Sequence, residues 1–521
     1  MTIRPLRLLH ETLIQSREKS PDKTALIVEG NSYTYAELFD IAGRIATLLL
    51  ERGLNRGDKV AIYMDNTIYA AASIYGALLA GGAFMVINPQ TKTDKLEYIL
   101  DNSDAKILLT DSHLSSVFKP LFSRLKKISG VLCSGEWPID QPKENLDVSF
   151  PVDSLVEALA HTEPIQAPQF SNPLDLAALI YTSGSTGNPK GVMHTHQSML
   201  FAAQSVAQYL RLSTDHRILN VLPFAFDYGL YQLLMSVLMG ATLILERSFT
   251  YPAQILKRMQ EFEVSVFPGV PTIYTTLISM HRRNPLSFPS VRRITNTAAA
   301  LPADYNTELK QIFPNALIYR MYGLTECKRT CYLEPELADI KPESVGKAIP
   351  GTETFLLSPD GDPVPVGTPG ILYARGPHVM LGYWKAPEQS NKMLKEGRFP
   401  GERILCTHDW FVMDKDGDLY FHGRSDDIIK SRGEKVSPIE VENVLYSLKG
   451  IREAAVIGVP DDLLGEAIKA FVVLDDPSIT ERDVQKHCLS RLENFMVPKY
   501  IEIVKELPKT PSGKITKKNL H

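Results

Sequence analysis

The sequence predicts an α/β fold: a large N-terminal domain of parallel-rich sheets flanked by helices, and a small α+β C-terminal domain. Two observations support the two-domain α/β architecture. Short apolar runs alternate with amphipathic helical patterns through roughly the first four hundred residues, which is typical of parallel sheets covered by helices. A polar, glycine-bearing segment then precedes a shorter set of helix and strand patterns. The 521 residues are enough for several hydrophobic cores.

The first long helix is expected to begin at Thr34-Tyr-Ala-Glu37, which has the pattern of a capping box. Apolar residues then recur at helical spacing, and Gly53 can end the helix. A buried strand is expected at residues 60–64. The uncharged run 69–87 is broken by Gly81-Gly82, so it predicts a buried helix, a glycine turn and a buried strand rather than a membrane span.

Further elements follow the same alternation. A short helix is predicted at residues 96–100 and a strand at 107–109, and later buried strands are predicted at 176–180, 218–222, 242–245 and 264–267. The polar, proline-bearing residues 160–173 are interpreted as a link between two subdomains.

The C-terminal residues form a separate pattern. A helix is expected to open at Pro438, strands are expected at 454–457 and 470–474, and Thr480 is expected to cap a last helix. The strand-like residues 419–422 are followed by a polar run. We therefore expect a large domain over residues 1–423 and a small, mobile domain over residues 424–521.

Composition excludes several classes of protein. Lys and Arg number 56 against 60 Asp and Glu, so the net charge of −4 gives no general basic excess for nucleic acid. Five irregularly spaced cysteines suit a reducing compartment rather than a disulfide framework. Residues 1–18 lack the apolar core of a secretory signal. The expectation is a cytoplasmic protein with no membrane span and no nucleic-acid partner.

The strongest local signal is the run Tyr181-Thr-Ser-Gly-Ser-Thr-Gly-Asn-Pro-Lys190-Gly191. Its glycines let backbone N–H groups approach a phosphate, its hydroxyls add donors, and Lys190 adds a positive charge. It is not a Walker P-loop, because Pro189 precedes Lys190 and Gly191 follows it. A surface Gly/Ser loop is the alternative, but the preceding strand and the lysine favour phosphate binding.

Four more segments follow in order: Tyr322-Gly-Leu-Thr-Glu326, Thr407-His-Asp409, Gly423-Arg-Ser-Asp-Asp-Ile-Ile-Lys430 and Pro508-Lys-Thr-Pro-Ser-Gly-Lys514. Each alone has an ordinary interpretation as a turn, a strand end, a solvated charge run or a tail. Together they resemble the adenylate-forming superfamily, which includes acyl- and aryl-CoA ligases, peptide-synthetase adenylation domains and luciferases. The resemblance covers the chain from about residue 10 to residue 519.

This resemblance implies a two-step ligase reaction. A carboxylate attacks the α-phosphate of ATP to give an acyl-adenylate and pyrophosphate, and a thiol then displaces AMP. It implies ATP and Mg²⁺ as cofactors, with CoA or phosphopantetheine as the acceptor thiol. Because the site must neutralise phosphate charge and align the attack, lysine, Mg²⁺ and backbone donors are the expected tools.

The resemblance also assigns residues. Lys514 would bridge the substrate carboxylate and the α-phosphate, Thr325 would contact that phosphate, and Glu326 would hold Mg²⁺. Asp409 would bind the ribose hydroxyls, and Asp426 would be the hinge on which the small C-terminal domain rotates. The residues assigned to ATP are Thr182, Ser183, Gly184, Ser185, Thr186, Gly187, Lys190, Ala298, Ala299, Tyr322, Asp409 and Arg424.

The chain departs from the family pattern in two places. His408 stands where the family often has glycine, and the adenine-facing segment 296–300 is alanine-rich rather than glycine-rich. His194 and His196, which follow the phosphate loop, are interpreted as structural or solvent-facing rather than metal ligands, because no metal-like pattern surrounds them.

The acid pocket is expected at Phe226, Asp227, Gly269, Val270, Asn296 and Met321. Asp227 has two interpretations that stay open: a reader of a substrate ammonium, as in amino-acid-activating members, or a cap of a helix beginning at Tyr228. Lys328 and Arg329 would face a substrate acid, a carrier-protein phosphate or only solvent.

The favoured substrate is a small amino acid such as proline, as in the stand-alone prolyl carrier-protein ligases of natural-product biosynthesis. A medium- or long-chain fatty acid or an aryl acid is the alternative. Because the sequence shows no fused carrier domain, the acceptor is expected to be CoA or a separate acyl or peptidyl carrier protein. A catalytically silent binding protein and a luciferase-like oxygenase are the alternative interpretations from other functional classes. The oligomeric state is left open.

Overall fold

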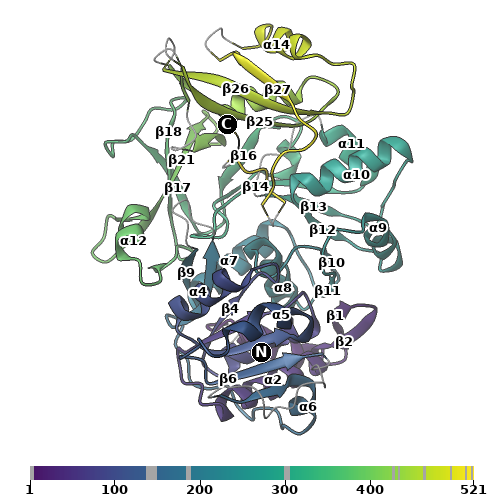
Figure 1. Cartoon of the computed structure of the whole chain (residues 1–521), viewed down its shortest axis with the longest axis vertical. Coiled ribbons are helices and arrows are strands. Elements are labelled where there is room, and N and C mark those ends of the chain that lie inside the picture. Colours follow the sequence, from purple (N-terminus) through teal and green to yellow (C-terminus); the bar gives the residue numbers. More distant parts are fainter. Residues whose placement is uncertain are drawn as a thin grey trace.

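The computed structural model describes residues 5–135, 150–182, 189–297, 305–424, 429–431, 434–461, 465–492, 496–510, 513–517 and 520. Its helices and sheets form a large lobe that holds most of the chain and a small lobe at the C-terminal end (Figure 1). This agrees with the predicted α/β fold.

An eight-stranded sheet of the described residues contains most of the strands predicted first along the chain. Its order is β19-β9-β8-β4-β3-β5-β6-β7, and all neighbours from β8 to β7 run parallel. The strands are β3 (Lys59–Tyr63), β4 (Ala83–Val86), β5 (Ala105–Asp111), β6 (Gly130–Ser134), β7 (Val152–Ser154), β8 (Leu176–Thr182), β9 (Lys190–Thr195) and β19 (Gly382–Tyr383).

The interpretation of residues 160–173 as a link between subdomains is wrong. These residues connect β7 to β8 through α6 and a loop, and both strands belong to the same sheet. The proline-bearing composition identified a loop, but composition does not determine which strands a loop joins.

A second, fourteen-stranded sheet of the described chain has a parallel part and an antiparallel part. The parallel part carries the predicted strands and supplies the ends from which the acid pocket is built. Its strands are β1 (Thr24–Val28), β2 (Asn31–Thr34), which pairs antiparallel with β1, β10 (Arg217–Asn220), β11 (Thr242–Leu245), β12 (Val266–Gly269), β13 (Arg293–Asn296) and β14 (Leu317–Tyr322).

The antiparallel part extends the same sheet beyond β14 and was not predicted in detail. It consists of β15 (Cys331–Tyr332), β16 (Ser344–Ala348), β17 (Glu353–Leu357), β18 (Gly370–Arg375), β20 (Leu394–Glu396), β21 (Arg403–Met413) and β22 (Leu419–Arg424). Asp409 and Arg424 are register partners on β21 and β22, so this part brings the two predicted nucleotide residues opposite one another.

Helices cover these sheets. They are α1 (Glu11–Lys19), α2 (Tyr35–Glu51), α3 (Ile68–Leu79), α4 (Thr93–Ser103), α5 (Ser115–Phe118), α6 (Leu155–Ala160), α7 (His196–Tyr209), α8 (Asp227–Met239), α9 (Pro252–Glu261), α10 (Pro271–Arg283), α11 (Tyr305–Ile312) and α12 (Pro387–Met393). The predicted capping box at Thr34 and Glu37 is present at the start of α2. The run 69–87 forms α3, a turn at Gly81 and β4, as predicted.

The largest core lies where α2 and α3 pack together against the sheets. Gly76 of α3 approaches α2 so closely that an added Cβ would lie 2.7 Å from Ile45 Cγ2. Burial of α3 is nearly complete, and no helix in the described residues is both long and apolar enough to cross a bilayer. The run of small and apolar residues therefore serves helix packing inside the large lobe.

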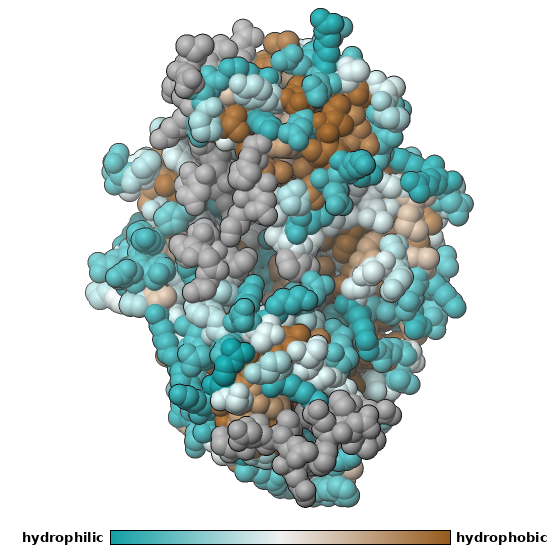
Figure 2. Space-filling model, viewed as in Figure 1, coloured by the Kyte–Doolittle hydropathy of each residue, from teal (hydrophilic) through white to brown (hydrophobic). Residues whose placement is uncertain are grey.

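The small lobe has its own five-stranded sheet in the described chain. It is formed by β23 (Ile429–Ser431), β24 (Glu434–Val436), β25 (Ile451–Asp461), β26 (Gly465–Leu474) and β27 (Tyr500–Ile503), with α13 (Pro438–Tyr446) and α14 (Glu481–Leu489). The change from the large sheet to this one falls between Arg424 and Ile429. The face in view is mixed in hydropathy, with a hydrophobic patch on the small lobe at the top (Figure 2).

Candidate active site

The C-terminal tail brings Lys514 to the large lobe. Figure 1 shows a C-terminal segment, in yellow, running down from the small lobe toward β13 and β14, while the C-terminal end is marked on the small lobe. A turn closes where Thr510 N donates to Lys514 O at 2.7 Å, and a Cβ at Gly513 would lie 3.0 Å from Thr272 Oγ1 on α10. Lys514 Nζ then lies 5.6 Å from the ring centroid of Phe226, a residue of the predicted acid pocket.

Glu326 lies beside a tyrosine that sequence reasoning missed. Tyr383 on β19 donates its hydroxyl to Glu326 Oε1 at 2.6 Å, and Lys190 Nζ lies 5.3 Å from the Tyr383 ring centroid. Burial, and then the charge of Glu326, raises the pKa of Tyr383 well above its usual value, so its hydroxyl remains a donor. One aromatic side chain thus brings together the carboxylate and the lysine that were predicted from separate motifs.

The donor set fits a hard divalent cation such as Mg²⁺. Glu326 is only 9% exposed, and its carboxylate is held in place by the Tyr383 hydroxyl. Carboxylate oxygen is the ligand that Mg²⁺ prefers, usually completed by water and substrate phosphate. Thr182 ends β8 and Lys190 begins β9, whereas Ser183, Gly184, Ser185, Thr186 and Gly187 lie outside the described residues.

His194 supports the backbone of Thr325. The fully buried imidazole lies with Nε2 at 2.9 Å from the Thr325 carbonyl oxygen. Burial, followed by the charge of Lys328, lowers the pKa of His194 well below its usual value, so the ring is neutral. Since a carbonyl only accepts, the Nε2–H tautomer is the one that satisfies this contact. The sequence predicted a structural histidine but not this positioning of Thr325.

His196 is also structural, as expected. Its Nδ1 accepts a hydrogen bond from Leu9 N at 3.1 Å, which ties the start of α7 to the N-terminal segment. Burial lowers the pKa of His196 to about 4.

The predicted nucleotide-binding residues on β14 and β21 are in direct contact. Tyr322 donates its hydroxyl to Asp409 Oδ2 at 2.5 Å, and its ring packs against Phe411 with centroids 4.8 Å apart. Asp409 is 5% exposed. A buried carboxylate with a fixed donor is suited to receive further donors such as ribose hydroxyls. The Arg424 side chain, Ala298, Ala299 and Asp426, the predicted hinge, lie outside the described residues.

The predicted acid-pocket residues come from adjacent carboxyl ends of parallel strands and from two helix starts. Gly269 ends β12, and Asn296 ends β13 as its register partner. Met321 lies on β14, and Val270 is the N-cap of α10. Strand ends of this kind are where open α/β sheets bind ligands.

The interpretation of Asp227 as a helix cap is wrong. The helix α8 begins at Asp227 rather than at Tyr228, its N-cap is Phe226, and the cap makes no side-chain hydrogen bond. Asp227 is 6% exposed. Its carboxyl group is therefore buried in the first turn of α8, next to Phe226.

The solvent-facing interpretation of Lys328 and Arg329 is also wrong. They are 1% and 7% exposed, respectively. The chain reverses after Tyr322, with Lys328 N donating to Leu324 O at 2.7 Å and Lys328 at a φ of 66°, a region that non-glycine residues rarely adopt. The turn directs both cations inward against α8.

Gly323 makes this reversal possible, and its replacement by alanine is expected to be costly. A Cβ at Gly323 would lie 2.3 Å from the Lys328 carbonyl oxygen, so the loop would have to shift. We expect G323A to lower the free energy of unfolding by about 1–3 kcal/mol and to impair acid-dependent ATP–pyrophosphate exchange. Chemical denaturation and exchange assays measure the two effects.

A matched control is G53A, where an added Cβ meets nothing within 4 Å but the φ of 76° is unfavourable. It should lose some stability through backbone strain and keep full exchange activity. Equal exchange by G323A and the wild-type protein would contradict the proposed role of the loop.

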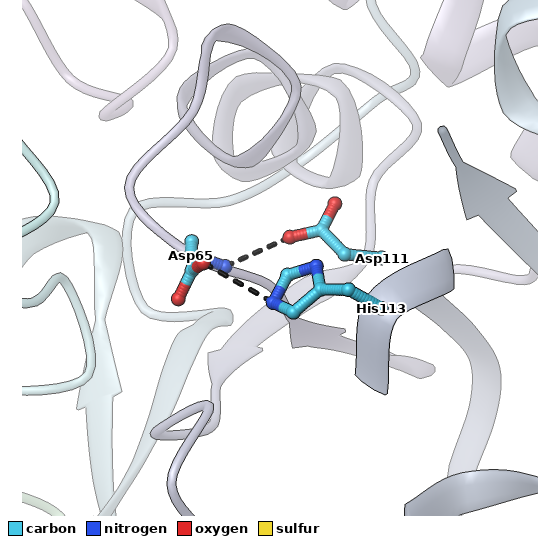
Figure 3. A group of neighbouring side chains, drawn as sticks. All are labelled: Asp65, Asp111 and His113. Carbon is cyan, nitrogen blue, oxygen red and sulfur yellow. Dashed lines mark hydrogen bonds and ion pairs between the residues drawn. The ribbon is translucent and has the colours of Figure 1, made fainter. Parts of the chain in front are cut away.

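Two other groups, made of Asp and His side chains, have the spacing of metal ligands within the described residues. Asp65, Asp111 and His113 form the first; Asp111 accepts from Asp65 N at 2.9 Å, and His113 Nε2 lies 3.2 Å from Asp65 Oδ2 (Figure 3). The second, Asp414, Asp416 and Asp418, surrounds the Lys341 ammonium at 2.5–2.8 Å, so a lysine already occupies its centre and offsets one of the three negative charges. Neither group contains Glu326.

Comparison with known proteins agrees with this site. The AMP-binding enzyme family model matches residues 13–384, and the AMP-binding enzyme C-terminal domain matches residues 440–514. The chain is 31% identical to a long-chain-fatty-acid–CoA ligase of Bacillus subtilis (strain 168), covering 99% of this chain and 94% of the relative. It is 33% identical to a feruloyl-CoA synthase of an Amycolatopsis species, covering 97% and 96%.

A solved structure gives the same result. The crystal structure of the anthranilate CoA ligase AuaEII in complex with anthranoyl-AMP has a TM-score of 0.89 and 28% identity, covering 98% of this chain and 96% of that chain. The family models match parts of both lobes, including the phosphate loop, residues 322–326 and Lys514, and the solved structure covers 98% of the chain. The chain therefore belongs to the AMP-binding enzymes, the adenylate-forming acid–thiol ligases that use ATP and Mg²⁺.

Proposed function

We propose that this chain activates a small carboxylic acid through Lys514, Thr325 and Glu326 and passes the acyl group to a thiol supplied by a separate molecule. Lys514 would hold the substrate carboxylate against the α-phosphate, Thr325 would contact that phosphate, and Glu326 would hold Mg²⁺. Lys190 and the loop from Thr182 to Gly187 would bind the outer phosphates. The metal would supply charge neutralisation for the leaving pyrophosphate.

The observation that carries this proposal is the contact of Lys514 with Phe226. A lysine from the small lobe reaches the acid pocket of the large lobe, 5.6 Å from the Phe226 ring centroid. This arrangement suits the first half-reaction. The thiol step would require Lys514 to leave, and we propose residues 1–423 and 424–521 as the two domains, with Asp426 as the hinge.

Nucleotide binding is proposed around Tyr322 on β14 and Asp409 on β21. Tyr322, Asp409 and Arg424 would receive the ribose and adjacent phosphate, and Ala298 and Ala299 would face the adenine. The short contact between Tyr322 and Asp409 supports a fixed acceptor at this position. Gly269, Val270, Asn296 and Met321 would line the acid.

Two classes of acid are candidates. A small amino acid, proline among them, is favoured by the buried Asp227 carboxylate, which forms no cap and could receive a substrate ammonium. A fatty or aryl acid is favoured by the relatives, whose names give a long-chain fatty acid and a feruloyl group. CoA or a separate carrier protein would be the acceptor. We propose a cytoplasmic reaction, for which five free cysteines are suitable.

Acid-dependent ATP–pyrophosphate exchange tests the proposal. The panel comprises proline and other small amino acids, aryl acids, and short to long fatty acids. An acid-dependent signal that requires Mg²⁺ is expected from at least one class. Exchange without any added acid, or none with any acid, would contradict ligase activity.

The D227N variant distinguishes the two classes of acid. If Asp227 receives an ammonium, KM for an amino acid should rise at least tenfold, because a charge-assisted hydrogen bond is lost, while KM for the same acid without its amino group stays unchanged. The comparison uses the matched acids on both proteins. An equal change for both acids would reject the ammonium interpretation.

A further inference from the structure

Lys328 carries a buried ammonium group without a hydrogen-bond partner among the described residues. Its side chain is 1% exposed, and Nζ makes no hydrogen bond within that part of the chain. An ammonium offers three N–H donors, and a charge removed from water without partners is strongly unfavourable. Its nearest aromatic neighbour is Tyr231 on α8, with Nζ 5.5 Å from the ring centroid. A cation–π contact compensates only part of this cost.

Arg329 places a second cation beside the first. Its guanidinium lies 4.7 Å from the Tyr228 ring centroid, and its Nη1 donates to the Lys328 carbonyl oxygen at 2.8 Å. Its Nε is buried and makes no hydrogen bond. Two consecutive residues thus present unused N–H donors to the same region of α8.

The neighbouring carboxylates do not account for both cations. Among the carboxylates, Asp227 has the largest electrostatic influence on Lys328, followed by Glu326. Among the described residues no ion pair within 4.0 Å joins Lys328 or Arg329 to either carboxylate, and in the proposed function the Glu326 charge is used to hold Mg²⁺. If Asp227 offsets one cation at a distance, the region still has one positive charge in excess.

Both cations line a cavity next to the predicted acid pocket. The cavity also contacts Tyr231, Gln232 and Met235 of α8 and shares Met321 with that pocket. Its volume of about 10 Å³ admits a group of roughly the size of one water molecule. Such a space suits a compact polar group and not a long alkyl chain.

We infer that the acid substrate carries a second, anionic group, a carboxylate at its far end, and that Lys328 and Arg329 bind one of its oxygens in this cavity. The inference rests on the proposed function, in which the other carboxylate is activated beside Lys514. It names the substrate class as a small dicarboxylic acid or an acidic amino acid. A structural pair of Lys328 and Asp227 would instead be expected to show direct contact, which is the usual state of buried charges.

The wild-type protein provides the first test, by ATP–pyrophosphate exchange with eight acids. Butyrate, succinate, 2-aminobutyrate and aspartate vary the second carboxylate and the amino group independently at four carbons, and valerate, glutarate, norvaline and glutamate repeat this at five. We expect the diacid of a matched pair to have at least a tenfold higher kcat/KM, because a site with unsatisfied donors rejects the analogue that lacks the acceptor. Comparison of the acids that have an amino group with those that lack one distinguishes dicarboxylic acids from acidic amino acids as substrates.

Variants then assign the preference to residues. K328M keeps an unbranched side chain and removes the charge, so the diacid preference should fall at least tenfold while monoacid exchange is retained or improved. R320M removes another buried cation, on β14, which does not line the cavity and binds Asn306 at 2.9 Å. It should leave the preference unchanged. Thermal unfolding checks that each variant is folded.

The outcomes are separable. Exchange with monoacids that equals or exceeds that with diacids in the wild-type protein overturns the inference and leaves the ligase proposal intact. Exchange with no acid overturns both. A diacid preference that K328M and R329M leave unchanged also overturns the assignment. If K328M does not fold, the wild-type panel and R329M still decide the matter.

Discussion

Replacing Lys514 by alanine is expected to lower acid-dependent ATP–pyrophosphate exchange by roughly 100-fold or more while sparing thiol transfer from a preformed acyl-adenylate. The ammonium is the only group of the C-terminal tail that is proposed to take part in the first step. It lies by Phe226 in an arrangement in which the tail packs against α10, so we expect it to act in that arrangement of the two lobes. Removing it should therefore affect one half-reaction.

The neighbouring lysine offers a matched control. Lys509 lies on the same tail and forms an ion pair with Glu453 at 2.6 Å inside the small lobe. K509A removes a charge from this segment without touching the acid pocket, so exchange should be close to that of the wild-type protein. Single-turnover assays with a supplied acyl-adenylate measure the second step. Equal loss of both steps in K514A would contradict a rotating small domain.

Several helices and strands of the large lobe were predictable because each has a strong local pattern. The capping box at Thr34 and the helix, turn and strand of residues 69–87 depend on neighbouring residues alone. The antiparallel strands β15 and β18 were not predicted: β15 is only two residues long, and the short apolar run of β18 at residues 371–374 was not assigned. Their pairing is fixed by contacts distant in sequence.

The same difference between local patterns and contacts distant in sequence applies to the candidate active site. Tyr383 contacts Glu326 across 57 residues, and His194 contacts Thr325 across 131, so no motif contains either pair. Lys328 and Arg329 have the composition of an exposed turn, yet a reversal at Gly323 directs them inward. Burial of a charge is decided by the packing of α8 against β14, and a local pattern does not predict it.

Replacing Asp409 by asparagine is expected to raise KM for ATP and leave KM for the acid unchanged. Asp409 is a buried acceptor whose Oδ2 already receives the Tyr322 hydroxyl, so the carboxylate is oriented before ATP binds. Asparagine has one acceptor oxygen in place of two and adds an amide donor, which cannot receive a ribose hydroxyl. Loss of a hydrogen bond to a charged group costs about 1.5–3 kcal/mol, or roughly 10- to 150-fold in kcat/KM for ATP.

The Y322F variant tests how much ATP binding depends on the orientation of the Asp409 carboxylate. Phenylalanine keeps the ring that packs against Phe411, with centroids 4.8 Å apart, and removes only the donor to Asp409. We expect a smaller rise in KM for ATP than in D409N, because the carboxylate retains both acceptor oxygens and loses its fixed orientation. Steady-state kinetics with ATP and acid varied separately provide the measurement. If D409N changed KM for the acid instead, Asp409 would belong to the acid pocket, and the proposal that it binds the ribose would be wrong.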